Sequence, residues 1–491
     1  MTALVAHITA FIDSIDWFLA ILFYVPSVLS AQHALLSKRD PRAALGWMSM
    51  ALVFPVAGPL LYYIFGISRV ESRAARLLEE RARNARGEDE RLHGGPARHE
   101  PPGSVPDELL PPRYVPFARV GRSIIGRPLS GGNYVKPLYN GEEAYPAMRE
   151  AIDKAERTVF LSSYIFGGRD EGERFVASLA DAAARGVDVR VLVDGVGGLY
   201  SWPRAWSRLR KRGVRVERFL PPRLWPLQLS INLRNHRKVL VCDGKVGFTG
   251  GMNIADNHLA DSECYRRVKD VHFLFSGPIV AQLQEAFLRD WGFVTGEYAR
   301  VPAREDPCGD TLCRMVLEGP GDREEHLHEL LCGVLSSAVR TVRIMTPYFL
   351  PSREMMSALR AAALRGVDVR VLLPLHNNLP FVHWASLHLL PGLLQAGVRV
   401  RHQQGPFVHT KLLVVDGCYT HVGSANIDAR SLRLNFELTV EMFDTSVARQ
   451  LTRYFDASWR GAPEMDAGVL QQRSYPVRVR DALCWLFSPY L

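Results

Sequence analysis

The sequence lacks closely spaced cysteine pairs. Its seven cysteines are scattered, and none stands in a C-x-x-C arrangement. In a chain of 491 residues this absence argues against a zinc ribbon and against a small disulfide-stapled scaffold. We therefore interpret the cysteines mainly as free thiols and predict no metal site.

Extremes of composition are also missing. The hydrophobic fraction of 47% and the charged fraction of 23% are ordinary for a folded chain, which excludes wholesale disorder and a polytopic transporter. The length allows roughly three domains. Lys and Arg number 60 against 51 Asp and Glu, a net charge of +9 that suits an anionic partner such as phospholipid or nucleic acid.

Two uncharged runs stand near the N-terminus, Trp17 to Ser37 and Ala43 to Ser68. Each has about the 20 residues that a membrane-spanning helix needs. The first run has no basic residues before it and is followed at once by the second, which argues against a cleaved signal peptide. Pro55 and Pro59 predict a bend or break, so the second run either crosses the bilayer or re-enters it.

Arginines after the second run outnumber the basic residues of the short loop between the runs, which favours a cytoplasmic main body. A Pro/Gly-rich linker from Gly94 to Pro112 separates these segments from the body. The predicted organisation is membrane segments (1–70), an arginine-rich stretch and linker (71–117), a first half (118–305), a second half (306–465) and a basic, aromatic C-terminal tail (466–491). The tail suits either a bilayer surface or a packed terminal helix or strand.

The body contains an internal repeat. The octapeptide Arg185 to Leu192 recurs without change as Arg365 to Leu372, each time after an Ala/Leu-rich helical stretch. Each half alternates strands with helices, the pattern of parallel βαβ units. We predict an α/β fold of two duplicated halves related by a pseudo-twofold axis.

Each half carries one unusual cluster with the spacing H-x-K-x4-D-x6-G-[GS]-x-N. Chance predicts roughly 0.012 matches to its H-x-K-x4-D part in a chain of this composition. Only eight of the 60 basic residues are lysine, yet both clusters hold one. The members are His236, Lys238, Asp243 and Asn253 in the first half, and His409, Lys411, Asp416, Ser424 and Asn426 in the second.

These residue types suit chemistry on a phosphodiester. Residues i and i+2 of a strand share a face, so each His and Lys can point into one cleft. One imidazole can attack phosphorus while the other moves protons, and the lysines can neutralise the phosphate oxygens. We expect Asn253, Ser424 and Asn426 to contact those oxygens, and we expect no metal or cofactor to be needed.

Carboxylates are needed to orient such histidines. Glu437 and Asp270 follow the two motifs at comparable places and are candidates for this support. Asp243 and Asp416 are candidates for the catalytic set, but each precedes a glycine, so a turn-forming role is an equally good interpretation.

Other histidines receive a structural interpretation, because nothing pairs them with a ligand pattern. Four histidines, at positions 376, 383, 388 and 402, fall close together in the sequence, but their spacing is too irregular for a zinc site. The histidines interpreted in this way are His7, His258, His326, His328, His376, His383 and His388.

The paired motifs resemble the HKD motifs of the phospholipase D superfamily, and most of the chain resembles the bacterial cardiolipin synthases. The segments Asn235 to Lys238, Gly250 to Ala255, Thr346 to Pro351 and Gly423 to Ser431 carry the resemblance. It implies that two phosphatidylglycerol molecules form cardiolipin and glycerol through a phosphohistidine, with His236 as nucleophile and His409 as acid and base. It also implies anionic lipids of a bacterial inner membrane as partners, and not nucleic acid. Asp256 to His258 depart from the Arg-Ser continuation of the second motif.

Several alternatives remain open. A phospholipase D-type hydrolase or a phosphatidylserine synthase would use the same motifs, because residues outside them select water or an alcohol as acceptor. A phospholipase D-like nuclease would suit the basic charge but not the apolar N-terminus. A catalytically dead lipid-binding scaffold disagrees with the intact His and Lys of both motifs. The oligomeric state is not predicted.

Overall fold

The computed structural model describes residues 22–38, 41–66, 103–222, 233–261, 267–298, 301–303, 306–319 and 326–488. The chain forms two units, Met1–Arg73 and Ala74–Leu491.

The N-terminal unit is helical. Residues 22–37 form one helix, and it is followed by α2 (Pro41–Val53), α3 (Ala57–Leu61) and a π-helical turn η1 (Tyr62–Gly66). The break between α2 and α3 contains Pro55, whose carbonyl oxygen accepts a hydrogen bond from Ser27 Oγ at 3.0 Å. Helices are therefore present in both predicted segments, and the second is interrupted at the proline, as expected.

Large apolar side chains cover much of the outside of this unit, among them Leu36 at 78% exposed and Val53 at 67% exposed. Within the described residues, no helix reaches both the length and the hydropathy required for a transmembrane span. Residues 17–21 of the first predicted segment lie outside the described part of the chain.

The larger unit consists of two halves with matching element order. The elements of the first half are β2 (Leu129–Tyr139), α6 (Asn140–Asp153), β3 (Thr158–Ser163), α7 (Asp170–Ala184), β4 (Asp188–Asp194), α8 (Ala205–Lys211), β5 (Arg215–Phe219), β6 (Val239–Cys242), β7 (Val246–Gly250), β9 (Val271–Ser276) and α9 (Ile279–Thr295). Those of the second are β10 (Thr311–Glu318), α10 (His326–Ser337), β11 (Thr341–Met345), α11 (Arg353–Leu364), β12 (Asp368–Pro374), α12 (Pro380–Leu394), β13 (Arg399–Gln403), β15 (Leu412–Val415), β16 (Tyr419–Gly423), β17 (Glu437–Phe443) and α14 (Thr445–Arg460).

Shorter elements complete this unit. They are β1 (Ser104–Val105), η2 (Asp107–Leu109), α5 (Val115–Ile125), η3 (Gly197–Leu199), η4 (Asp256–His258), β8 (Val268–Lys269), β14 (Phe407–Val408), α13 (Ala429–Arg433), α15 (Ala467–Gln471) and α16 (Tyr475–Leu486).

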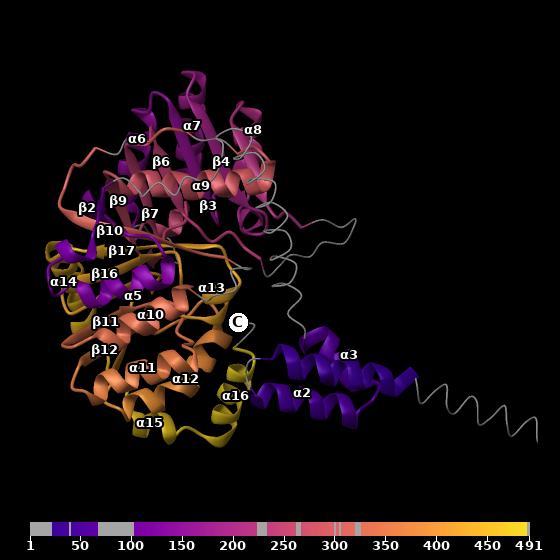
Figure 1. The fold of residues 1–491 in the computed structure, drawn as a ribbon. Coiled ribbons are helices and arrows are strands. Elements are labelled where there is room, and N and C mark those ends of the chain that lie inside the picture. Colours follow the sequence, from indigo (N-terminus) through magenta and orange to yellow (C-terminus); the bar gives the residue numbers. More distant parts are fainter. Residues whose placement is uncertain are drawn as a thin grey trace, which may run out of the picture. The chain divides into compact units, whose positions relative to one another are not determined.

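All strands but β8 and β14, which pair separately, form one mixed sheet in the order β13-β12-β11-β15-β16-β17-β10-β2-β9-β7-β6-β3-β4-β5, and β1 pairs with β2. Read inward from its two ends, the sheet has the same sequence of equivalent strands, because β13, β12 and β11 correspond to β5, β4 and β3. The two halves are therefore related by a pseudo-twofold axis. Strands β3, β4 and β5 are parallel, and so are β11, β12 and β13. Figure 1 shows the halves one above the other with β2, β9, β10 and β17 between them. The predicted duplicated α/β fold is confirmed.

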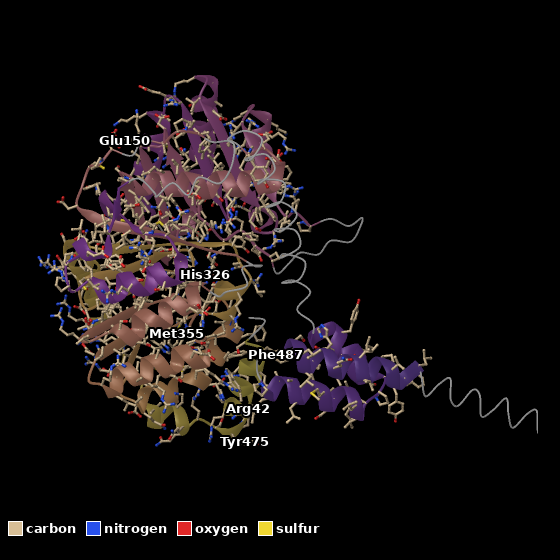
Figure 2. The ribbon with its side chains drawn as sticks, in the orientation of Figure 1. Arg42, Glu150, His326, Met355, Tyr475 and Phe487 are labelled. Carbon is tan, nitrogen blue, oxygen red and sulfur yellow. The ribbon has the colours of Figure 1, made fainter. Side chains whose placement is uncertain are left out.

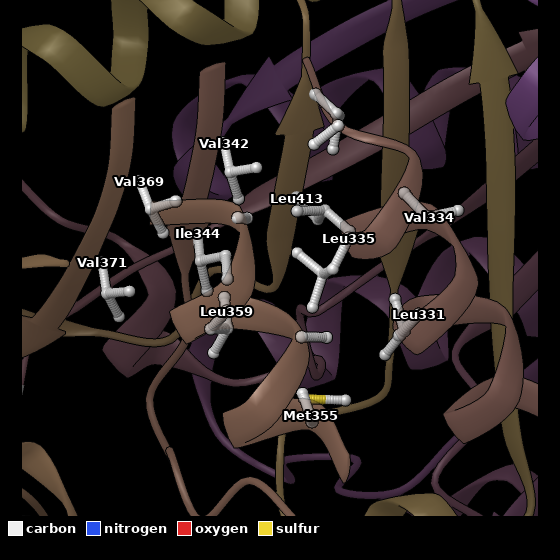
Figure 3. Close-up of a cluster of buried hydrophobic side chains, with 14 of the residues drawn as sticks. Leu331, Val334, Leu335, Val342, Ile344, Met355, Leu359, Val369, Val371 and Leu413 are labelled. Atoms are coloured by element: carbon white, nitrogen blue, oxygen red, sulfur yellow. The ribbon is translucent and has the colours of Figure 1, made fainter. Parts of the chain in front are cut away.

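The three largest apolar cores among the described residues of this unit lie in different places. One lies under α5, α10 and α11, where Leu335 and Leu359 pack against Ile344 (Figure 3). A second lies under α6, α7 and α8. The third joins the halves, because it contains Phe273 of β9 and Val440 of β17 together with the apolar faces of α9 and α14.

Helix α5 differs from the predicted organisation. It begins at Val115, so the predicted boundary at residue 118 falls inside a helix. Phe117 lies in the core of the second half beside Leu330, and the backbone oxygen of Ala118 accepts from the Arg314 guanidinium at 3.3 Å. A stretch that precedes the first half in sequence therefore packs with the second half in space.

Candidate active site

Each histidine motif is anchored by the opposite half of the body. The backbone N–H of His236, just before β6, donates to the oxygen of Phe436 at 2.9 Å. The N–H of His409, just before β15, donates to the oxygen of Lys269 at 2.8 Å, next to the short parallel pair β14–β8. Both histidines therefore lie where the two halves meet.

The orienting carboxylates are exchanged between the halves. Nδ1 of His236, in the first half, lies 3.0 Å from both carboxylate oxygens of Glu437, in the second half. Nδ1 of His409, in the second half, lies 2.7 Å from Oδ2 of Asp270, in the first. A neutral imidazole that donates from Nδ1 keeps the lone pair of Nε2 available for attack or proton transfer.

Burial sets the protonation of these groups. Both carboxylates are fully buried, which by itself raises a carboxyl pKa, but the facing histidines and lysines outweigh this and lower the pKa of Glu437 and of Asp270 to about 2 each. Burial lowers the pKa of His236, and burial together with Lys411 lowers that of His409 to about 3. At neutral pH the site holds two carboxylates and two neutral imidazoles.

The two lysines lie beside the histidines. Lys238 Nζ donates to the oxygen of His236 at 2.7 Å, and Lys411 Nζ donates to the oxygen of His409 at 2.6 Å. Burial is the main cause that lowers the pKa of Lys238 to about 7 and that of Lys411 to about 8, and the charge of Lys411 lowers the pKa of Lys238 further. A bound phosphate would relieve this repulsion and favour both ammonium forms.

Ser424 supports Glu437, which corrects the expectation that its hydroxyl contacts phosphate. Its buried hydroxyl donates to Glu437 Oε2 and accepts from the N–H of Leu438 at 3.0 Å. Asn435 Nδ2 donates to the other oxygen of Glu437 at 3.0 Å. Glu437 is therefore held from two sides, and the Ser424 hydroxyl is already engaged.

The equivalent position in the first half is Gly251, and it explains part of the motif spacing. A Cβ at this position would lie 2.6 Å from both carboxylate oxygens of Asp270. The preceding Gly250 has a φ of 154°, and a Cβ there would lie 2.9 Å from the Cα of His272 on the neighbouring strand. The glycines thus let β9 approach closely enough for Asp270 to reach His409.

The motif asparagines are buried. Asn253 Oδ1 accepts from the N–H of Ile165 at 3.2 Å, and Asn426 Nδ2 donates to Ser431 Oγ at 3.2 Å. Oδ1 of Asn426 has no partner among the described residues. Contact of these two side chains with substrate stays a prediction.

Asp243 and Asp416 occupy turns at the far ends of the motif strands. Asp243 follows β6, has a φ of 55°, and accepts from the backbone N–H groups of residues 156, 157 and 158 at 2.7 to 3.0 Å. Asp416 follows β15, has a φ of 53°, and accepts in the same way from residues 339, 340 and 341 at 2.7 to 2.9 Å. The geometry supports the turn interpretation, and we remove both residues from the catalytic set, because a strand separates them from the histidines.

His258 lies in the site and does not have the purely structural surroundings that its sequence context predicts. Its ring centroid is 5.9 Å from that of His409, with the planes at 73°. It is buried, its Nδ1 has no partner among the described residues, and burial lowers its pKa to about 4. It occupies the position that Ser431 has in the second half. This difference between the two motifs is the one feature of the sequence that indicates a special role for His258.

Arg237 was also missed by the sequence analysis. This buried guanidinium donates to Asp290 Oδ1 at 2.5 Å and to the backbone oxygens of Glu437 and Glu318 at 3.0 Å each. It fastens the first motif to the strand that carries Glu437. The second motif has Thr410 at the equivalent position, so comparing the two motifs does not indicate a role for Arg237.

Metal ligation is not apparent in the described part of the chain, where no group of three or more His, Cys, Asp and Glu side chains is arranged to hold an ion. The rings of His383 and His402, from the irregular histidine cluster, approach within 5.7 Å of each other. Chemistry without a metal stays a prediction.

Comparison with known proteins identifies the family to which this chain is similar. The family model "Cardiolipin synthase, PLD-like domain" matches residues 148–291 and 331–459, and the model "Phospholipase_D-nuclease N-terminal" matches residues 17–66. A "Cardiolipin synthase" of Geobacillus kaustophilus (strain HTA426) is 34% identical over 463 residues, 93% of this chain and 90% of that protein. "Cardiolipin synthase A" of Pseudomonas putida (strain KT2440) is 33% identical over 475 residues, 96% and 97% of the two chains.

Among solved structures, a phosphatidylserine synthase from Haemophilus influenzae Rd KW20 superposes with a TM-score of 0.60 at 14% identity. The match covers 76% of this chain and 100% of that one. At this identity the likeness concerns the fold alone.

Proposed function

The chain belongs to the cardiolipin synthase family of phospholipase D-like enzymes, and from this premise we propose its substrates and the role of each motif residue. It is a phosphatidyltransferase of the cardiolipin synthase type. We propose that it joins two phosphatidylglycerol molecules into cardiolipin and releases glycerol. The observation that carries this is the exchange of Glu437 and Asp270 between the halves, which gives each motif histidine a fixed tautomer within one site.

In the first half-reaction Nε2 of His236 attacks the phosphorus of one phosphatidylglycerol. An N–P bond forms, the P–O bond to the headgroup glycerol breaks, and protonated His409 gives its Nε2 proton to the leaving oxygen. Glu437 stabilises the positive charge that develops on His236, while Lys238 and Lys411 stabilise the non-bridging oxygens.

The second half-reaction reverses these roles. Nε2 of His409 takes the proton from a headgroup hydroxyl of the second phosphatidylglycerol, whose oxygen attacks the phosphohistidine. The N–P bond breaks, cardiolipin forms and His236 returns to its neutral form. A bound phosphodiester places negative charge beside His409, which raises its low pKa and supports proton uptake for the first step.

We further propose that the N-terminal segments insert into a bacterial inner membrane, with the catalytic body on the cytoplasmic side. The exposed apolar side chains of residues 22–66 support insertion, and the arginines that follow Ser68 support this orientation. Anionic lipids, and not nucleic acid, are the expected partners.

Product analysis tests the function. The purified full chain is incubated with phosphatidylglycerol alone, and the lipids are identified by mass spectrometry. Cardiolipin and glycerol in equal amounts are expected from the unmodified enzyme and from the control Glu464→Gln, whose side chain pairs with Arg401, and neither from His236→Ala or His409→Ala. Phosphatidic acid as the main product would instead assign a hydrolase.

A further inference from the structure

Two equivalent loops leave the sheet on the side of the candidate active site. One joins β4 to α8 and the other joins β12 to α12. Both follow the carboxyl ends of parallel strands, and the histidine motifs lie at this same edge because β6 and β15 run antiparallel to β3 and β11. The two loops therefore flank the site, one from each half.

Both loops present large apolar side chains to solvent. In the first loop Leu199 is 45% exposed, Tyr200 70% and Trp202 73%. In the second, Leu379 is 45% exposed, and Phe381 at the start of α12 is 59% exposed. We call these five residues the apolar rim. Within each loop these side chains are near neighbours in sequence, and groups of exposed apolar side chains mark interaction surfaces.

Side-chain contacts connect the first loop with the catalytic histidine. The ring of Tyr164 lies 5.1 Å from that of His236 and 6.5 Å from that of Tyr200. Ser201 Oγ donates to the oxygen of Phe166 at 2.8 Å, which fixes the loop beside this tyrosine. The first loop is thus held one aromatic side chain away from His236.

Hydrogen bonds fix the second loop in a comparable way. Tyr348 Oη donates to Asn378 Oδ1 at 2.9 Å, and Asn377 Nδ2 donates to the oxygen of Pro347 at 2.9 Å. Asn377 Oδ1 accepts from the N–H of Leu379 at 2.8 Å. These hydrogen bonds hold the base of the loop, while Leu379 and Phe381 remain exposed.

Helix α16 adds apolar surface next to this loop. It packs on α12 through Cys484 and Trp485, which contact Val382. Tyr475 and Phe487, labelled in Figure 2, are exposed at its two ends, at 78% and 61%. The C-terminal tail is thus a packed helix with an exposed apolar side.

The charges near the rim indicate which partner fits. The guanidinium of Arg204 lies 5.7 Å from the ring of Trp202, and that of Arg480 lies 4.2 Å from the ring of Trp384 on α12. Aromatic rings with neighbouring arginines favour the interface of a bilayer that contains anionic lipid. Arginine and aromatic residues are also enriched in protein–protein interfaces, so contact with a protein is an outcome that the experiment has to distinguish.

We propose that the apolar rim docks the catalytic body onto the surface of an anionic phospholipid bilayer, so that a lipid headgroup passes between the two loops to the histidines. The inference rests on the proposed function, since it takes a bilayer lipid as substrate. It adds that the body itself contacts the membrane, through residues outside both motifs.

Paired kinetic measurements test the proposal. The full-length enzyme is reconstituted in phosphatidylcholine vesicles that contain long-chain phosphatidylglycerol, or in the same vesicles with dihexanoyl-phosphatidylglycerol supplied from water below its micellar concentration. The double variant Trp202→Glu and Phe381→Glu should lose tenfold or more activity on the bilayer lipid and less than twofold on the dispersed lipid.

Matched controls come from the opposite edge of the sheet. Val339 and Leu364 are 75% and 73% exposed, and they lie before the amino ends of β11 and β12. Val339→Glu and Leu364→Glu should change neither activity by more than twofold. Equal bilayer activity in the rim variant and these controls would overturn the proposal.

A readout that does not depend on turnover separates this inference from the proposed function. Vesicles with brominated acyl chains should quench the tryptophan fluorescence of the unmodified protein more than that of Trp202→Phe, even if no cardiolipin forms. Equal quenching of the two proteins would overturn docking at Trp202. Protection of Trp202 in a self-associated form would assign the rim to contact between copies of the chain, and would also overturn it.

Discussion

Glu437 of β17 accepts a hydrogen bond from Nδ1 of His236 at 3.0 Å, although the two residues are 201 positions apart and belong to different halves. Asp270 and His409 make the reciprocal pair at 2.7 Å. For both motif histidines, the orienting carboxylate therefore comes from the opposite half. Duplication therefore supplied one composite site, in place of two complete ones.

Glu437→Gln should lower kcat by about 10²- to 10⁴-fold with little change in KM, because an amide cannot stabilise the positive imidazole that forms on His236. Steady-state kinetics with phosphatidylglycerol measure this. Glu464→Gln is the matched control, since Glu464 is partly exposed and pairs with Arg401 away from the site. Similar kcat values for Glu437→Gln and the unmodified enzyme would remove Glu437 from the mechanism.

Gly251→Ala should lower kcat at least tenfold, because its Cβ would approach the Asp270 carboxylate to 2.6 Å and displace it from His409. Gly461→Ala serves as control, since a Cβ at that position meets nothing within 4 Å. Both proteins should unfold within a few degrees of each other in a thermal scan. Full activity of Gly251→Ala would show that the position of Asp270 is not critical.

Affinity for phosphatidylglycerol should weaken as pH rises. The pKa values of Lys238 and Lys411 are lowered to about 7 and about 8, mainly by burial, so the free enzyme loses these two positive charges between about pH 7 and 9. The dissociation constant for dihexanoyl-phosphatidylglycerol, measured by titration calorimetry from pH 6.5 to 9, should increase by tenfold or more. A constant value across this range would mean that the lysines stay charged without ligand.

Stability should fall on mild acidification. Burial lowers the pKa of His421 to about 3 and, with the charge of Lys411, that of His409 to about 3, whereas an unfolded histidine titrates near 6.5. The unfolded chain therefore binds more protons below pH 6.5, and the stability present above that pH is progressively lost toward pH 3. The thermal midpoint should drop between pH 7 and 5, and less so in His421→Asn. Equal drops in both proteins would locate the acid sensitivity elsewhere.

His258→Ser, which copies the second half, should change the pH dependence of turnover and lower kcat by about tenfold, because the ring that contacts His409 is lost. Glu464→Gln serves again as the control, because Glu464 pairs with Arg401 away from the site. A lower kcat with an unchanged pH profile would reduce His258 to a packing role.

The sequence predicted the features that repeat. The identical octapeptide covers the turn into β4 and into β12, and the motif spacing placed both His-x-Lys pairs at the start of short buried strands. Hydrophobic periodicity and motif spacing depend only on residues close together in the sequence, so they can be recognised in a single sequence.

Other features depend on which segments meet in space. Helix α5 packs on the second half, and each motif histidine pairs with a carboxylate of the other half. Both contacts depend on the pairing of β2 with β10, which joins the two halves. Asp243 and Asp416 each precede a glycine, and only the bonds to the start of β3 and β11 distinguish a turn from a catalytic acid. His258 stands where the second half has Ser431, so comparing the halves marks the position as different but does not show that its ring lies against His409.

The most direct test of the composite site is to locate the covalent intermediate. The enzyme is mixed with phosphatidylglycerol, quenched within milliseconds and digested, and the peptides are analysed by mass spectrometry under conditions that preserve phosphohistidine. The account predicts a phosphatidyl adduct on His236 that is absent in His236→Ala and persists in His409→Asn with a substrate bearing a good leaving group. An adduct on His409 in the unmodified enzyme would contradict the assigned roles, and no adduct at all would favour direct transfer between the two lipids.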